Sequence, residues 1–348
     1  MTKRIGVLTG GGDCPGLNAV IRAVVRRAIV LNDYEMIGIK SGWKGLIDLQ
    51  TMPLDRANVT GILYRGGTIL GTSRTNIFKD EATTKTVIDN IKKLKLDGIV
   101  AIGGEDTLGV AKKLTDLGIN VVGVPKTIDN DLNGTDFTFG FDTAVEIATD
   151  AVDRLHTTAE SHNRVLVCEV MGRHAGWIAT YAGIAGGADC ILIPEKPIDI
   201  NEVCGVIERR HKRGAYFSII VVAEGAKIII GAKEKEVTSS SRIDEFGHVQ
   251  LGGVGQELAK AIEKKTGYET RVTVLGHIQR GGKPTAHDRV LATRFGVAAM
   301  NAVHAGRFGV FVALNGKDVV EVPLSQVTKG IKTVDEDLYE MSKTFWGY

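Results

Sequence analysis

The chain has 348 residues, enough for two α/β domains or one large domain. Lys and Arg total 43 against 41 Asp and Glu, so the formal charge of +2 creates no field that would attract a nucleic acid or an anionic membrane. A hydrophobic content of 43% with 24% charged residues excludes wholesale disorder. Glycine makes up about 12% of the chain against a usual value of about 7%, so we expect many turns and ligand-binding loops.

The four cysteines show neither a CxxC pair nor a histidine at zinc-binding spacing, which argues against a metal knuckle or a disulfide framework and indicates a reducing compartment. The N-terminal residues reach a glycine loop too soon for the apolar core of a signal peptide. No run of about 18 apolar residues occurs. We therefore expect a soluble, cytoplasmic protein that binds no membrane and no nucleic acid.

Short apolar runs rich in Val and Ile recur along the chain, and each ends in a polar, glycine-bearing loop followed by a helical pattern, which is typical of buried parallel strands. We predict strands at residues 5–9, 35–39, 98–102, 121–124, 165–170, 190–193, 218–223 and 271–275. Amphipathic patterns predict helices at residues 17–30, 83–94 and 109–117. Repeated βαβ units indicate an α/β fold.

Two stretches mark the organisation of the chain. We predict a domain boundary near Gly140, where the loop PKTIDNDLNGTDFTFGFD gives way to a helical stretch over residues 142–159. Residues 226–253 combine a Lys/Glu run with SSS, which predicts an exposed excursion. No short-period repeat is present.

Function should concentrate after the strands, because ligands in open α/β sheets bind beyond the carboxyl ends. Residues 10–16, GGGDCPG, lie between a strand and a helix, where bare amides can hold an anion. This loop is not a Walker A motif, and Pro15 takes the place of the last glycine of GxGxxG. A structural glycine turn and a phosphate site therefore both remain open.

The next two loops mix glycines with charged and hydroxyl side chains. In RGGTILGTSR, residues 65–74, Arg74 is either a ligand-binding group or a surface charge. In GGEDT, residues 103–107, Glu105 could hold Mg²⁺ or cap a helix. Asp106 is unexpected in a phosphate-binding turn, because it would repel the anion that the turn attracts.

The loop PKTIDND, residues 125–131, indicates proton transfer to or from an alcohol. It places Asp129 and Asp131 two residues apart, beside Lys126 and Thr127. A carboxylate can take the proton of a hydroxyl while a cation neutralises charge on the transferred group. The alternative is an Asx-turn network with a surface lysine.

Later strands end in the loops EVMGRHAG, EG and GHIQRGG, and each loop contributes a charge. A phosphorylated sugar requires such a set, with arginines and His277 for its phosphate and Glu224 for a hydroxyl. Arg164 and Arg271 precede strands, so we expect them at the opposite edge of the sheet. Any one of these arginines alone would suggest only a surface charge.

Taken in order, these motifs resemble the bacterial-type phosphofructokinases, which phosphorylate fructose 6-phosphate at its 1-hydroxyl. The match covers nearly the whole chain, and its segments TIDND and GHIQRGG are specific, whereas GGD also occurs in lipid and NAD kinases. The resemblance implies the phosphofructokinase fold: α/β, with two Rossmann-like three-layer domains and mainly parallel sheets. It implies a phosphoryl-donor domain of residues 1–140 plus about 279–324, and a sugar-phosphate domain of residues 141–278 plus about 325–348.

The resemblance also implies roles for the catalytic loops. Asp129 matches the base that takes the hydroxyl proton, and Asp131 the residue that holds the metal and orients the base. Thr127 matches a substrate-binding residue, and Arg173 the arginine that stabilises charge on the transferred group.

The remaining matched positions bind ligands. Those on the sugar-phosphate side are Met171, Gly172, Glu224, His277 and Arg280, and those on the donor and metal side are Gly12, Arg74 and Glu105. Arg164 and Arg271 match arginines that reach into a neighbouring subunit's site, which implies a homo-oligomer, a dimer or a tetramer.

Two departures concern the phosphoryl donor. The common ATP-using pattern reads GGDGS and PGTIDND, whereas this chain reads GGEDT and PKTIDND. Glu105 thus lengthens a metal ligand by one methylene. Asp106 and Lys126 each replace a glycine and resemble residues of the pyrophosphate-using branch, where we expect Asp106 to repel a nucleotide and Lys126 to stabilise the departing phosphate.

We therefore predict Mg²⁺-dependent, reversible phosphoryl transfer from pyrophosphate to the 1-hydroxyl of fructose 6-phosphate, giving fructose 1,6-bisphosphate and phosphate, in glycolysis or gluconeogenesis. ATP is the alternative donor, and sedoheptulose 7-phosphate stays open as a second acceptor. Arginines matching an effector site leave allosteric control open; they are Arg22, Arg26, Arg56 and Arg154. A non-catalytic sugar-phosphate sensor is a distant alternative, because a sensor has no need of the PKTIDND carboxylates and lysine. A nicotinamide dehydrogenase is disfavoured by the GxGxxG mismatch.

Overall fold

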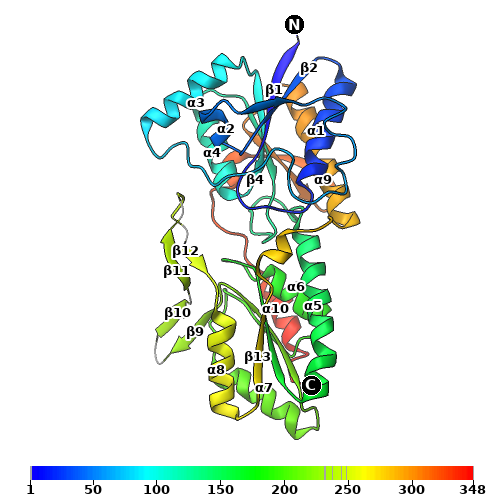
Figure 1. Ribbon diagram of the computed structural model, residues 1–348, viewed down its shortest axis with the longest axis vertical. Coiled ribbons are helices and arrows are strands. Elements are labelled where there is room, and N and C mark those ends of the chain that lie inside the picture. Colours follow the sequence, from blue (N-terminus) through cyan, green and yellow to red (C-terminus); the bar gives the residue numbers. More distant parts are fainter. Residues whose placement is uncertain (1, 231–232, 237, 244, 248, 348) are drawn as a thin grey trace.

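The computed structural model describes residues 2–230, 233–236, 238–243, 245–247 and 249–347. Figure 1 shows two groups of elements along the long axis of the molecule, one around β1, β2 and β4 and the other around β13 and α5 to α8. Each group has its own sheet with helices packed on it, so the chain forms two α/β units that are joined end to end.

The first sheet has the strand order β15-β14-β5-β4-β1-β2-β3. Its strands are β1 (Lys3–Thr9), β2 (Tyr34–Ile39), β3 (Thr51–Pro53), β4 (Gly98–Gly103), β5 (Val121–Pro125), β14 (Val310–Asn315) and β15 (Asp318–Pro323). The five inner strands are parallel, whereas β3 and β15 pair antiparallel at the two edges. The inner strands β4 and β5 are buried along their whole length, as runs of Val and Ile covered on both faces require.

The second sheet has the order β13-β6-β8-β7 and is parallel throughout. Its strands are β6 (Val165–Val170), β7 (Cys190–Leu192), β8 (Ser218–Ala223) and β13 (Thr270–Val274). The eight predicted strands are all present within two residues, whereas β3, β14 and β15 were not predicted. No strand was predicted after residue 275, so β14 and β15 were missed as strands, although the resemblance implied that residues 279–324 return to the first domain.

The helices of the first group are α1 (Leu17–Leu31), α2 (Lys44–Ile47), α3 (Glu81–Lys93), α4 (Glu105–Asp116) and α9 (Ala286–His304). The second group has α5 (Phe141–His162), α6 (Trp177–Ala185), α7 (Ile200–Lys212), α8 (Val254–Thr266) and α10 (Glu336–Lys343), with short 3₁₀ helices η1 (Gly276–Arg280) and η2 (Leu324–Gln326). The predicted start of α4 at residue 109 is wrong, because the helix begins at Glu105 after the N-cap Gly104.

The predicted domain limits, 1–140 plus about 279–324 and 141–278 plus about 325–348, stay a proposal that the pairing of elements supports. Helix α9 packs on α1, and β14 and β15 extend the first sheet, whereas α10 packs on α6 and β7. At the predicted boundary, Gly140 has φ of +93° and caps α5. A Cβ there would overlap the sulfur of Cys14, so only glycine allows this close approach of α5 to the first loop.

Residues 226–253 form two antiparallel hairpins, β9 (Lys227–Ile230) with β10 (Lys233–Glu236) and β11 (Thr238–Ile243) with β12 (Val249–Leu251). At the tip of the second hairpin Glu245 and Gly247 are exposed, as predicted for this excursion, whereas Phe246 is half-buried. There the carboxylate of Glu245 accepts a hydrogen bond from the amide of Asn76 at 2.9 Å, and Phe246 packs against the core cluster beside the first sheet. The second hairpin therefore reaches the first group of elements, whereas β9 and β10 lie beside the second group (Figure 1).

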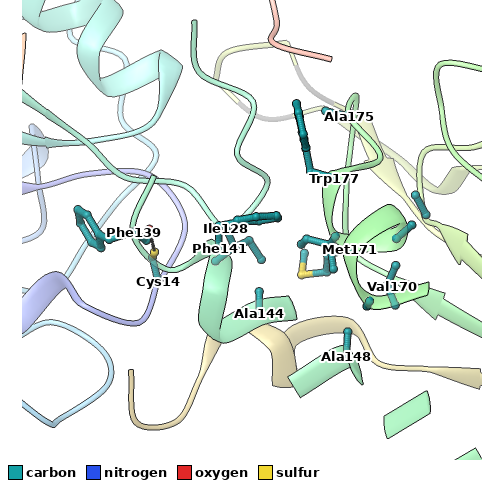
Figure 2. Packing of buried hydrophobic residues seen from close by; sticks show 14 of the residues in the cluster. Cys14, Ile128, Phe139, Phe141, Ala144, Ala148, Val170, Met171, Ala175 and Trp177 are labelled. Atoms are coloured by element: carbon teal, nitrogen blue, oxygen red, sulfur yellow. Dashed lines mark hydrogen bonds between the residues drawn. The ribbon is translucent and has the colours of Figure 1, made fainter. Parts of the chain in front are cut away.

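One apolar core cluster extends through both groups. Figure 2 shows Cys14 and Phe139 on one side and Met171 and Trp177 on the other, with Ile128 between them. All four cysteines are buried and free of disulfides. Within the described part of the chain, no helix is both long and apolar enough to cross a membrane.

Candidate active site

A cavity of about 400 Å³ lies where the carboxyl ends of the two sheets face each other. Its wall includes thirteen of the sixteen residues selected from the sequence: Gly12, Arg74, Glu105, Asp106, Lys126, Thr127, Asp129, Asp131, Met171, Arg173, Glu224, His277 and Arg280. Gly11, Gly104, Thr107, His174 and Leu251 also line it and were not predicted. The first four are direct neighbours of selected residues, whereas no sequence signal pointed to Leu251.

Lys126 is buried, so the alternative of a surface lysine is wrong. It follows β5 and donates a hydrogen bond from Nζ to the carbonyl oxygen of Gly12 at 2.6 Å. Only 3% of Lys126 is exposed, and this burial lowers the pKa of its ammonium to about 8. The ammonium thus lies behind the glycine loop that follows β1, where it can neutralise an anion held by that loop.

Two acidic residues open α4 at the cavity wall. Glu105 and Asp106 occupy the first turn, where carboxylates interact favourably with the helix dipole. The N-cap is Gly104, so the alternative that Glu105 itself caps the helix is wrong. Arg74 also lines the cavity, so the wall carries a guanidinium as well as the α4 carboxylates.

The loop that carries the two aspartates is tightly held. The amide of Asp129 donates to the hydroxyl oxygen of Thr127 at 3.1 Å, and the fully buried Asn130 accepts from the amide of Thr138 at 3.1 Å. Asn130 adopts a left-handed conformation with φ of +51°, which turns the chain between Asp129 and Asp131. Both carboxylates consequently face the cavity.

These carboxylates form an acidic group. Burial, followed by the charge of Asp129, raises the pKa of Asp131 above its ordinary value, and Glu105 acts in the same direction. The Oδ1 atom of Asp129 is buried and has no hydrogen-bond partner. Excess negative charge and a partnerless buried oxygen are the conditions under which a bound cation stabilises a site.

The donor set fits a cation that is completed by its substrate. Among the described residues, no group of three His, Cys, Asp or Glu side chains could hold a metal ion alone. Mg²⁺ is commonly held by one or two carboxylates together with substrate phosphates and waters. Glu105 and Asp131, beside the partnerless oxygen of Asp129, provide that kind of site.

The opposite wall follows the second sheet. Glu224 comes after β8, and its burial, followed by the charge of Asp129, raises the pKa of its carboxyl to about 7, although Arg280 acts in the opposite direction. A Cβ on Gly225 would overlap the carbonyl oxygen of Arg173, so this glycine allows the Arg173 loop to lie against Glu224. The carboxylate of Glu224 after β8 and the guanidinium groups of Arg173 after β6 and Arg280 after β13 therefore line this wall together.

Arg280 joins the two sides. It lies on η1, and its Nη1 atom donates to the carbonyl oxygen of Asp13 in the loop after β1 at 3.2 Å. Gln279, also on η1 and fully buried, accepts from the amide of Met171 at 3.3 Å. The segment after β13 is thus attached to both the β1 loop and the β6 loop.

Three selected residues do not line this cavity. Gly172 lies between Met171 and Arg173, with a φ of +132°. Arg164 and Arg271 lie at the amino ends of β6 and β13, and Glu269 accepts hydrogen bonds from both at 2.8 and 2.5 Å. The seven residue steps from Arg164 to Met171 correspond to about 23 Å along a strand, well beyond the reach of an arginine side chain.

The four arginines matched to an effector site also lie away from the cavity wall. Arg22 and Arg26 are on α1, Arg56 is exposed after β3, and Arg154 on α5 pairs with Asp150 at 2.9 Å.

The fold and the cavity define a two-domain α/β protein whose site combines glycine-rich loops, a buried ammonium and convergent carboxylates. The phosphofructokinase family profile matches residues 4–303. A pyrophosphate–fructose 6-phosphate 1-phosphotransferase of Amycolatopsis methanolica is 59% identical over 99% of this chain and 100% of its own length. The chain therefore belongs to the phosphofructokinase family.

Other relatives use a different donor by name. An ATP-dependent 6-phosphofructokinase 3 of Streptomyces coelicolor is 51% identical over 97% of this chain and 98% of its own length. The solved structure of a pyrophosphate-dependent phosphofructokinase from Nitrosospira multiformis superposes with a TM-score of 0.84, at 23% identity, over 97% of this chain and 87% of that one. At that identity the structural likeness bears on the fold alone, and it confirms the predicted phosphofructokinase fold.

Proposed function

We propose that this protein transfers a phosphoryl group from pyrophosphate to the 1-hydroxyl of fructose 6-phosphate, with Mg²⁺ as cofactor. The observation that carries the proposal is the donor wall of the cavity, where Asp106 stands at the start of α4 and the buried ammonium of Lys126 stands behind the β1 loop. The relatives at 57–59% identity named as pyrophosphate-dependent support the same donor.

In the proposed reaction the donor phosphates lie against the loop after β1 and the start of α4, near Gly12 and Arg74. The sugar phosphate lies on the opposite wall, where His277 and Arg280 bind its phosphate and Glu224 accepts from a sugar hydroxyl. Bound Mg²⁺, held by Glu105 and Asp131, would neutralise phosphate charge.

Asp129 takes the proton of the 1-hydroxyl as that oxygen attacks the phosphorus atom. A new O–P bond forms, the P–O bond to the second phosphate breaks, and inorganic phosphate leaves with the bonding electron pair. The guanidinium of Arg173 stabilises charge on the transferred group, and the ammonium of Lys126 stabilises the departing phosphate. The step conserves atoms and charge. By microscopic reversibility the reverse reaction passes through the same transition state and uses the same groups.

The proposal extends to assembly. Arg164 and Arg271 lie too far from their own cavity to bind its ligand, yet Glu269 holds both guanidinium groups at one edge of the second sheet. We infer that they complete the site of a neighbouring subunit, in a homo-oligomer. The buried, unpaired cysteines and phosphorylated substrates favour a cytoplasmic location.

A donor assay tests the function. With fructose 6-phosphate and Mg²⁺ we expect turnover with pyrophosphate to exceed turnover with ATP. Two unit charges about 4 Å apart repel by about 4 kcal/mol at an effective dielectric constant near 20, about a thousandfold in affinity, so an aspartate beside the path of a nucleotide is an effective filter. A parent enzyme that prefers ATP would contradict the proposal and favour the second candidate, which the ATP-dependent relatives at 51% identity support.

The filter itself is tested by substitution. Asp106→Gly, alone or with Lys126→Gly, should raise the ratio of ATP-dependent to pyrophosphate-dependent kcat/KM, by about tenfold or more. Glu81→Gly, which places a glycine in the first turn of α3 away from the cavity, is the matched control and should leave the ratio unchanged. An unchanged ratio in the double variant would show that neither residue selects the donor.

A further inference from the structure

The C-terminal segment 330–334 lies beside the loop that carries the catalytic aspartates. The amide of Lys332 donates to the carbonyl oxygen of Asp131 at 2.9 Å. Directly next to this bond, Ile331 and Leu132 form an isolated antiparallel bridge. The segment is therefore paired through its backbone with the loop after β5.

The same segment is attached to the loop that carries Arg173. The indole N–H of Trp177 donates to the carbonyl oxygen of Lys332 at 2.9 Å. One carboxylate oxygen of Glu195 accepts from the amides of both Val334 and Gly176 at 3.0 Å. Gly176 and Trp177 end the Arg173 loop, so residues 330–334 connect two loops that belong to different sheets.

The side chain of Lys332 strengthens this connection. Its ammonium donates to the carbonyl oxygens of Thr135 at 2.9 Å and Asp136 at 2.7 Å, beyond Asp131 in the same loop. It also lies 5.2 Å from the centre of the Trp177 ring, within the range of a cation–π interaction. The amide, carbonyl and ammonium groups of Lys332 thus make four hydrogen bonds to two loops.

We propose that Lys332 is a positioning residue for phosphoryl transfer, which holds the Asp129–Asp131 loop at a fixed place relative to the Arg173 loop. Lys332 is not among the residues that line the cavity. The inference depends on the proposed function only in taking Asp129 and Arg173 to act on the same phosphoryl group. Because a displacement of about 1 Å between reacting groups can cost about a hundredfold in rate, the effect belongs in kcat.

The test compares Lys332→Met, Lys332→Arg and the matched control Lys329→Met. Methionine keeps an unbranched apolar stem on Trp177 and removes the charge, whereas arginine keeps a cation that can donate to both carbonyls. Lys329 is exposed, directly precedes the segment 330–334, and does not line the cavity. We expect Lys332→Met to lower kcat about tenfold or more, with KM for both substrates within about threefold, and Lys332→Arg to restore most of the loss.

A second measurement does not depend on activity. Hydrogen exchange of peptides from residues 126–136 should be faster in Lys332→Met than in the parent and in Lys329→Met, because the loop loses its attachment. If the donor assay fails but this exchange difference appears, the proposed function is wrong and the attachment stands. If the parent is active and kcat of Lys332→Met stays within about threefold of it, or exchange is unchanged, the positioning role is overturned.

Trp177→Phe provides the same test should Lys332→Met fail to fold. Phenylalanine keeps a ring under the ammonium and removes the N–H that binds the carbonyl of Lys332. We expect a smaller loss in kcat, about threefold or more, with KM unchanged and faster exchange over residues 330–334. Parental kcat together with parental exchange would overturn the inference.

Discussion

The pKa values of individual ionisable side chains at the cavity are shifted because burial removes water from them. Burial is the largest cause of the raised pKa of Glu224 and of the lowered pKa of Lys126, and it disfavours the charged form in both. The Oδ1 atom of Asp129 is buried without a partner. All three side chains line the cavity, so a bound ligand can supply the partner that the Oδ1 atom of Asp129 lacks.

The first prediction concerns Asp129. If its carboxylate takes the hydroxyl proton, Asp129→Ala should lower kcat by about 10² to 10⁴-fold with little change in sugar-phosphate affinity, because only the transition state loses an interaction. Steady-state kinetics and a binding titration measure the two effects. Asp89→Ala on the exposed face of α3 is the control. A kcat within tenfold or so of the parent would exclude Asp129 as the base.

The second prediction is a pH dependence set by Lys126. Its pKa in the folded protein is lowered to about 8, so the ammonium is present below that pH and is lost as the pH rises through it. We expect kcat/KM for pyrophosphate to fall above about pH 8, because this parameter reports ionisation of the free enzyme. Lys126→Arg, whose guanidinium stays charged, should shift the alkaline limb upward. A limb at the same pH in both proteins would assign it to another group.

At the scale of elements, the starts of α5 and α9 are locked together. The buried carboxylate of Asp288 accepts from the amide of Thr143 at 2.9 Å and from its hydroxyl at 2.5 Å. Thr285, the N-cap of α9, accepts from the amide of Asp288 at 3.2 Å and donates to Asp142 at 2.6 Å. This network joins a helix of the second group to a helix that packs on the first sheet.

The third prediction follows from the burial of Asp288, which raises the pKa of its carboxyl from 3.8 to about 6. The native state then binds the proton more tightly than the unfolded chain, so the contribution of Asp288 to stability is complete below pH 3.8 or so and is lost as the pH rises through about 6. Relative to Asp288→Asn, the parent should lose about 2 kcal/mol of unfolding free energy between about pH 4 and pH 7. Denaturant titrations measure this difference, and a pH-independent difference would show that the carboxyl is not shifted.

At the scale of the whole molecule, the site is predicted to need two chains. Arg164 and Arg271 lie at the amino ends of the strands of the second sheet, where both pair with Glu269. The cavity lies at the carboxyl ends of the same strands. A closed oligomer could bring those amino ends to a neighbour's cavity.

The fourth prediction tests this by complementation. Arg164→Ala subunits mixed with Asp129→Ala subunits should regain activity, up to about a quarter of the parental sites in a random dimer, because some sites then receive an intact copy of each residue. Neither variant alone should be active. Subunit exchange is verified separately by mixing two differently labelled preparations. Exchange without recovered activity would place both residues in the site of one subunit.

Strand positions followed from the sequence because buried parallel strands are continuous apolar runs, and β6 and β8 were predicted with their observed bounds. The family was likewise predicted from motifs at the strand ends and is confirmed. The return of β14 and β15 to the first sheet was not predicted from the residues, because pairing between strands more than a hundred residues apart leaves no local pattern.

Local chemistry was determined by the sequence: which residues are charged, which loops carry glycine, and which positions, Asp106 and Lys126 among them, depart from an ATP-using pattern. Only the tertiary structure decided that Lys126 is buried, that Glu245 reaches Asn76, and that Lys332 joins the loop after β5 to the loop after β6. Burial and long-range contacts depend on how two sheets and their connecting segments pack in space. The residue type determines the charge and hydrogen-bonding capacity of a side chain, whereas packing determines its burial and its partners.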